Sequence, residues 1–119
     1  MKKIISTPLV FGMFAFTSML FAQEMTKDQR KAFQTDDIET FKKFFPKEDY
    51  NKCFGIKETS FSLLTFSVIH ERKNIFNYLL SNNADVNKAC DNQTPLMAAN
   101  SYKKPELAKI LVKKGAKKN

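Results

Sequence analysis

The sequence has 119 residues and a formal net charge of +8, from 20 lysines and arginines against 12 aspartates and glutamates. Its three glycines, Gly12, Gly55 and Gly115, stand too far apart to form a phosphate-binding loop. The single histidine, His70, and the two cysteines lack the short paired spacing of a zinc site, and no nucleophile or acid pair gathers around His70. We therefore expect no metal, no cofactor and no enzyme.

Residues 1–22 have the pattern of a secretory signal peptide. A basic start precedes an apolar run that begins at Ile4, and the small residue Ala22 offers a cleavage point. The alternative is an uncleaved membrane anchor over residues 4–22, a span diluted by a proline, a glycine and polar side chains. We expect cleavage near Ala22, a periplasmic or extracellular domain of residues 23–119, and no stable membrane anchor after cleavage.

The first part of this domain predicts a pair of helices followed by a hairpin. Ala32 lies in the first helix, and residues 36–45 have the apolar spacing of the second. Pro46 ends that second helix abruptly because it cannot continue the helical hydrogen bonds. Residues 47–61, with Gly55 among them, predict an extended and slightly irregular hairpin.

The rest of the chain contains two copies of one pattern. Residues 62–87 and 94–119 can be laid over each other without a gap, so equivalent positions lie 32 residues apart. Each copy has two short helix patterns and then a turn, in which Asn83 and Gly115 supply the left-handed conformation that ends a helix. A period of this length is typical of stacked helical repeats. Residues 27–61 fit the same template as a weaker third copy.

Most of the phenylalanines and aliphatic residues lie at helical spacing, which indicates a core between repeats. Phe54 and Phe61, in the hairpin region, are the exceptions and are candidates for the surface. The residues expected in the core are Phe41, Phe44, Phe45, Phe66, Ile75, Phe76, Leu79, Leu80, Leu96, Leu107, Ile110 and Leu111.

The third copy opens with Thr94 as a helix cap and Pro95 in the first helical position. With Leu96 and the paired alanines that follow, and with the run 84–87 of the preceding copy, these residues resemble the pattern of ankyrin repeats. Some positions depart from that pattern. Met97 and Thr65 stand where the family usually has histidine, residues 62–64 replace Thr-Pro-Leu, and residues 91–92 form the hairpin turn in place of Asp-Gly.

The resemblance covers about residues 27–119 and implies an all-α fold: an ankyrin-repeat solenoid of stacked antiparallel helix pairs with projecting β-hairpin loops. The expected repeats are about 27–61, 62–93 and 94–119. Proteins of this kind bind partner proteins through the concave face that the hairpin tips and first-helix ends form. Mapped onto this sequence, the expected partner-binding residues are Phe61, Ile69, His70, Asn92, Gln93, Ser101 and Tyr102.

The leading function is therefore an exported monomer that binds another protein, with an inhibitor or immunity-type protein as one version. The alternative is an electrostatic binder of anionic lipid or polymer, because seven lysines and only one acidic residue, Glu106, follow residue 102. No aromatic residue lies among the last lysines and only two arginines occur, so we expect no nucleic-acid binding and favour a solvated end cap. Salt separates these readings, since lysine-led binding weakens as salt is added.

The two cysteines, Cys53 and Cys90, occupy nearly equivalent places in consecutive hairpins. In an oxidising compartment a disulfide between them would contribute roughly 3–4 kcal/mol in the chain-entropy model. Equivalent atoms of neighbouring repeats usually lie farther apart than the ~7 Å bridging limit, which narrowly favours free thiols. The longer first hairpin works in the opposite direction. Both states stay open at this point.

Overall fold

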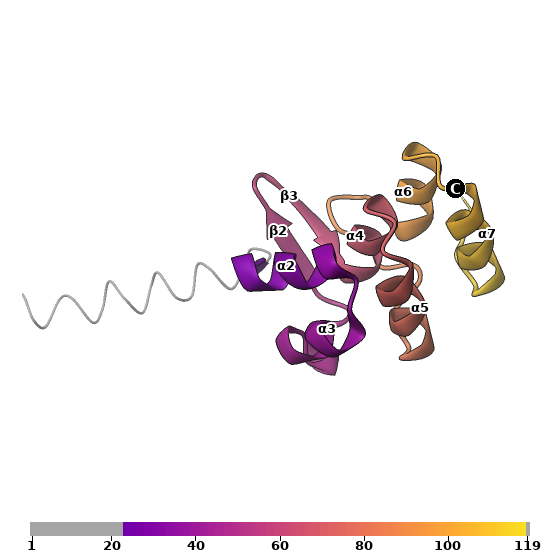
Figure 1. The fold of residues 1–119 in the computed structure, drawn as a ribbon. Coiled ribbons are helices and arrows are strands. Elements are labelled where there is room, and N and C mark those ends of the chain that lie inside the picture. Colours follow the sequence, from indigo (N-terminus) through magenta and orange to yellow (C-terminus); the bar gives the residue numbers. More distant parts are fainter. Residues whose placement is uncertain (1–22, 119) are drawn as a thin grey trace, which may run out of the picture.

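The computed structural model describes residues 23–118, and the expected signal peptide lies outside the described residues. Within this range no helix is long and apolar enough to cross a membrane. Three helix pairs follow one another along the molecule, and a small sheet lies beside the first two (Figure 1). The elements are β1 Gln23–Glu24, α2 Lys27–Thr35, α3 Ile38–Phe44, η1 Lys47–Asp49, β2 Cys53–Ile56, β3 Thr59–Ser62, α4 Leu63–Ile69, α5 Lys73–Ser81, α6 Pro95–Ser101 and α7 Pro105–Lys113.

The repeat predicted from the sequence is confirmed by the helix boundaries. Helices α4 and α6 each have seven residues, α5 and α7 each have nine, and the matching helices start 32 residues apart. Helix α4 packs against both α5 and α6, and α3 packs against α5. The result is the expected stack of antiparallel helix pairs.

The first helix of every pair begins at a hydroxyl cap. The side chains of Thr26, Ser62 and Thr94 each accept a hydrogen bond from the backbone N–H three residues later. Such a cap satisfies one of the free donors at a helix start, and Pro95 then occupies a position that needs no donor. The helix start predicted at Thr94 is confirmed.

Left-handed residues end the helices and turn the chain. Asp36, Glu71 and Lys103, which follow α2, α4 and α6, have φ angles of 53°, 53° and 57°. Asn83 (φ 66°) and Gly115 (φ 104°) do the same after α5 and α7, as the sequence predicts. A left-handed residue thus follows the first helix in all three repeats and the second helix in repeats two and three, whereas α3 ends at Phe45 with an extended backbone.

Two kinds of polar side chain connect one repeat to the next. The Asp36 carboxylate accepts hydrogen bonds from the backbone N–H groups of Asn74 and Ile75 at 3.2 and 3.0 Å, and so caps α5 from the previous repeat. In the loops after the second helices, Asn51 Oδ1 accepts from the N–H of Asp85 at 2.7 Å. Asn87 Oδ1 likewise accepts from the N–H of Lys117 at 2.8 Å.

The hairpin expected over residues 47–61 is present and longer than a simple loop. It opens with the short helix η1, after which β2 and β3 pair antiparallel with Phe54 opposite Phe61. Strand β1 adds to β2 in parallel, with Gln23 opposite Phe54. A sheet of three strands therefore flanks the first two repeats.

Two expectations about the phenylalanines are wrong. Phe54, expected at the surface, is fully buried, because β2 directs its ring onto Phe45 with centroids 5.5 Å apart. Phe44, expected in the core, is 37% exposed, because α3 ends at this residue and the extended backbone that follows brings Phe45 instead into contact with Phe33 and Phe41. Of the other core residues, Leu80 and Ile110 are half-buried and the rest are buried.

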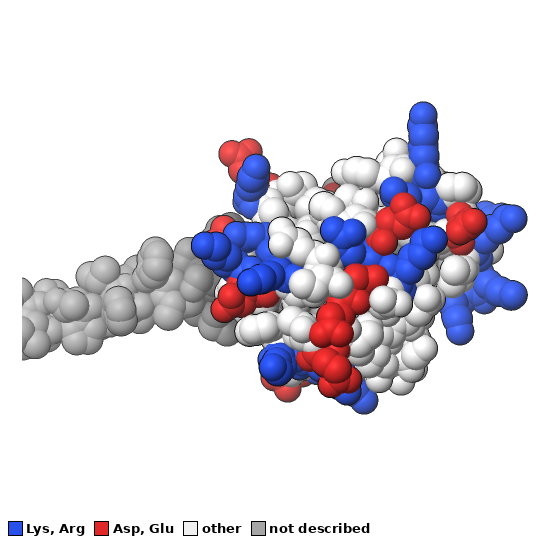
Figure 2. Space-filling view, viewed as in Figure 1, with Lys and Arg blue, Asp and Glu red and all other residues white. Residues whose placement is uncertain are grey.

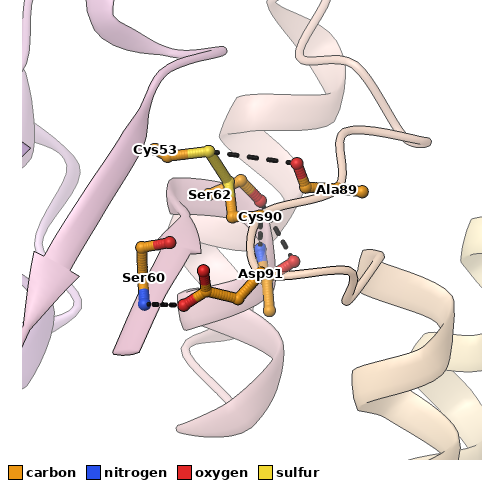
Figure 3. The surroundings of a disulfide bond; sticks show 7 residues. Cys53, Ser60, Ser62, Ala89, Cys90 and Asp91 are labelled. Carbon is orange, nitrogen blue, oxygen red and sulfur yellow. Dashed lines mark hydrogen bonds between the residues drawn. A yellow bond between two sulfur atoms is a disulfide. The ribbon is translucent and has the colours of Figure 1, made fainter. Parts of the chain in front are cut away.

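Cys53 and Cys90 are joined by a disulfide in the structure, with Cα atoms 5.8 Å apart (Figure 3). The two Cα atoms are therefore closer than the ~7 Å bridging limit, and the expectation that equivalent atoms of neighbouring repeats lie too far apart for a disulfide is wrong for this pair. The Asp91 carboxylate accepts a hydrogen bond from the Ser60 N–H at 2.7 Å and draws the two hairpins together beside the bond. Asp91 and the next residue both have positive φ, and Cys90 pairs with Gln93, which confirms the predicted turn.

Candidate functional site: the concave face

The concave face is the side of the stack formed by the hairpins and by the C-terminal ends of α2, α4 and α6. His70 and Tyr102 occupy equivalent positions on it, as the residues that follow α4 and α6, and both are exposed. Ile69 and Ser101 are the last residues of the same two helices. Four of the seven expected partner-binding residues thus form two equivalent pairs.

The other three expected residues come from the hairpins. Phe61 lies in β3 and is half-buried, with its ring centroid 6.2 Å from that of Phe66. Asn92 is exposed in the turn of the second hairpin, and Gln93 next to it is half-buried and pairs with Cys90 through its backbone. Asn92 therefore presents its side chain to solvent, while Gln93 also has a structural part in the turn.

A cavity of about 290 Å³ opens where the first hairpin meets the first helices of repeats one and two. We call it the arginine pocket, because it contains both arginines of the chain. Of the seven expected residues only His70 lines it. The lining residues are Arg30, Phe33, Gln34, Ile56, Phe66, His70 and Arg72.

The backbone holds both guanidinium groups in place. Arg30 Nη1 donates to the Met25 carbonyl oxygen at 2.9 Å, and Arg72 Nη1 donates to the His70 carbonyl oxygen at 2.9 Å. Within residues 23–118, the ion pairs of 4.0 Å or less all involve lysines, so neither arginine is paired with a carboxylate. Arg72 Nε is buried and has no hydrogen-bond partner.

Glu71, the acidic residue next to Arg72 in the sequence, forms its ion pairs with lysines. Glu71 accepts a hydrogen bond from Lys104 Nζ at 2.9 Å and lies 3.7 Å from Lys73 Nζ. The hydrogen bond and charge of Lys104 hold the pKa of Glu71 below its usual value. The Glu71 carboxylate is therefore paired with the lysines of repeats two and three. Among the described residues, no carboxylate lies within 4.0 Å of either arginine of the pocket.

The surroundings of His70 disfavour a positive charge on its ring. Its ring lies 4.4 Å from that of Phe66. Burial lowers the pKa of His70, and the positive charges of Arg72 and Lys104 lower it further. The imidazole is accordingly neutral near pH 7 and offers the pocket a hydrogen-bonding group rather than a charge.

A second groove, of about 630 Å³, lies between α6 and α7 at the last repeat. Met97 and Val112 line it and are 41% and 38% exposed. The residue equivalent to Met97 in the previous repeat, Thr65, is buried. The groove therefore corresponds to the surface on which a neighbouring repeat stacks elsewhere in the molecule. Lysines also line it, and Figure 2 shows basic side chains gathered at the end of the molecule formed by α7.

The repeat pattern of the sequence does not single out the pocket. Gln29, Thr65 and Met97 each follow a helix cap by three residues, so Arg30 lies one position beyond the place where the resembled family usually has histidine. Arg72 stands at the repeat position of Lys104, the residue before α7, and Ile56 reaches the pocket from the first hairpin. Nothing within residues 23–118 groups three or more histidine, cysteine or acidic side chains as metal ligands.

Comparison with known proteins identifies the fold. The family model for ankyrin repeats matches residues 30–119 in three copies. No curated protein matches the chain.

Proposed function

The chain belongs to the ankyrin-repeat family, and from this premise we propose that it is an exported module that binds a partner protein through its concave face. Members of this family are in general non-catalytic protein–protein interaction modules. The observation that carries the proposal is the pair His70 and Tyr102. They repeat at equivalent positions on the concave face and are exposed in both repeats.

The chemistry of these side chains suits an interface. Tyr102 is 47% exposed and combines a large apolar ring with a hydroxyl, the type of residue that often carries binding energy. Phe61 is held against Phe66, so it would lose little conformational freedom when a partner covers it. The arginine pocket, which includes His70 and the Phe66 ring beside Phe61, gives the same face a charged recess.

Export is supported by two features of the chain. Residues 1–22 have a signal-peptide pattern, and the bond between Cys53 and Cys90 belongs to an oxidising compartment such as the periplasm. A small exported binder without catalytic groups suits an inhibitor or immunity-type protein, which acts by covering the surface of an enzyme or toxin. We propose this as the sharper version of the function.

The test is affinity capture of the tagged protein from its native cells, with mass spectrometry at moderate and high salt. His70→Ala combined with Tyr102→Ala should remove the captured partner while the melting temperature stays within about 3 °C of the parent protein. The matched control combines Lys43→Ala with Asn77→Ala, which removes two exposed side chains from α3 and α5. Equal capture by all three proteins would refute the concave face as the binding surface.

The lysine-rich end supports a second candidate, a binder of anionic lipid or polymer. Of the seven lysines from Lys103 to Lys118, only Lys104 takes part in an ion pair within the described residues. Their charge is therefore free for an anionic surface. Binding that disappears at high salt and survives the His70 and Tyr102 substitutions would favour this function over the first.

A further inference from the structure

The arginine pocket is of a size that suits a side chain rather than a small-molecule ligand. Its volume of about 290 Å³ lies at the lower limit of the roughly 300–1,000 Å³ found for small-molecule sites. It is also open to solvent at the concave face, where the proposed function places the partner. One or two side chains of a bound polypeptide would fill it.

The donors in the pocket are prepared for an acceptor that the described chain does not provide. Each guanidinium has five N–H donors, and only one nitrogen of each is seen bonded, to a backbone carbonyl that fixes the orientation of the side chain. Arg72 Nε is buried without a partner, a state that is unusual for a charged donor because burial removes water as well. A planar carboxylate matches the fork of a guanidinium with two parallel hydrogen bonds.

The walls of the pocket favour a carboxylate with apolar neighbours. The rings of Phe33 and Phe66 and the side chain of Ile56 line it beside the arginines. Apolar walls lower the local dielectric constant, which strengthens an ion pair once the partner excludes water. They also give an apolar side chain next to the carboxylate a surface on which to pack, which a free inorganic anion lacks.

We propose that the arginine pocket binds an aspartate or glutamate side chain of the partner protein, one that is flanked by apolar residues. Arg30 and Arg72 bind the carboxylate from the two repeats, and Phe33 and Phe66 contact its apolar neighbours. This inference rests on the proposed function, since it names the chemistry of the partner at the same face. It assigns a role to both arginines of the chain.

Nuclear magnetic resonance can observe the two arginines directly. Because the chain has only two, Arg30 and Arg72, the arginine Nε–Hε region of a ¹⁵N spectrum contains two side-chain signals, which single substitutions assign. The protein, purified after expression of the full chain, is titrated with two capped seven-residue peptides. One carries glutamate between two leucines, and the other carries glutamine in its place. Sodium phosphate is the third titrant.

The glutamate peptide should shift both arginine signals and bind roughly tenfold or more tightly than the glutamine peptide, since the latter cannot form a charge-assisted hydrogen bond. Arg30→Gln and Arg72→Gln should each weaken the glutamate peptide by roughly tenfold or more. The matched control is Lys31→Gln, which removes one positive charge from the neighbouring exposed position on α2 and should change the affinity less than twofold. Arg30 is exposed on α2, so its variant is expected to fold even if the Arg72 variant does not.

Three results would overturn the proposal: no binding of the glutamate peptide, equal binding of the two peptides, or equal weakening by Lys31→Gln. Phosphate that shifts the arginine signals as strongly as the peptide would also overturn it, because the site would then be a general anion site. Capture from native cells separates this inference from the proposed function. If His70 and Tyr102 are needed for capture while Arg30→Gln and Arg72→Gln are not, the interaction module stands and the carboxylate site fails.

Discussion

Removal of the Cys53–Cys90 bond should destabilise the protein strongly. The bond closes a loop with a sequence separation of 37 residues. In the chain-entropy model a loop of this length stabilises the folded state by about 4 kcal/mol, because the linked unfolded chain has fewer conformations. A loss of that size corresponds to a fall in melting temperature of about 15–30 °C for a domain of this length.

The experiment compares urea unfolding of the oxidised protein, the same protein with reductant, and the variant that combines Cys53→Ala with Cys90→Ala. Alanine suits Cys90, which is 3% exposed, because it buries no unpaired hydroxyl. The reduced protein and the double variant should agree within about 1 kcal/mol, and the double variant should not respond to reductant. For both, the free energy of unfolding should also fall more steeply with urea than it does for the oxidised protein, because an unlinked chain exposes more surface when it unfolds.

Intact-mass measurement after alkylation, with and without prior reduction, establishes whether the bond is present in the sample. If the oxidised protein carries the bond and still unfolds at the same urea concentration as the double variant, the loop-closure reasoning is refuted. If no mass change depends on reductant, the bond itself is absent and the two hairpins are held by the Asp91–Ser60 hydrogen bond and by packing.

Three further predictions concern single side chains, and urea unfolding tests each of them. Asp36→Ala should cost about 1–2 kcal/mol because α5 loses its cap, whereas Asp36→Asn, which keeps an acceptor oxygen, should cost less. Asn87→Ala should lower the free energy of unfolding by about 1 kcal/mol because the last loop loses its hydrogen bonds to Asn87. An unchanged free energy of unfolding would show that these hydrogen bonds do not stabilise the fold. Burial and the hydroxyl of Tyr78 raise the pKa of Tyr50, so stability should fall as the pH rises above 10, where the unfolded tyrosine ionises; Tyr50→Phe should make that fall shallower.

The repeat could be predicted from the sequence because its signals are local. A hydroxyl cap, a proline at the first helical position and a left-handed residue after a helix each depend on neighbours along the chain. Thr94 and Gly115 show these signals clearly, and the boundaries of α4 to α7 follow them with a constant offset. The connections between repeats were not predicted, although Asn51 and Asn87 stand at equivalent positions and make the same bond.

The arginine pocket was not predicted, because it depends on the path of the hairpin in space. The sequence predicts an irregular hairpin over residues 47–61 but does not say which face of it turns inward. Because side chains alternate along a strand, inward orientation of Phe54 also places Ile56 on the inner face of β2. As a result Ile56 lines the pocket, and Phe54, expected at the surface, lies in the core.

Strand β2 contributes to both the disulfide and the arginine pocket. Cys53 starts β2 and Ile56 ends it, so the bond anchors one end of the strand whose other end lines the pocket. Strand β1 fixes the outer edge of β2, and the paired strand β3 carries Phe61 to the concave face. A hairpin held on both sides costs little further ordering when a partner binds. The longer first hairpin, the feature that departs most from a regular repeat, therefore adds Ile56 as one wall of a recess whose charge comes from Arg30 and Arg72 in the helical repeats.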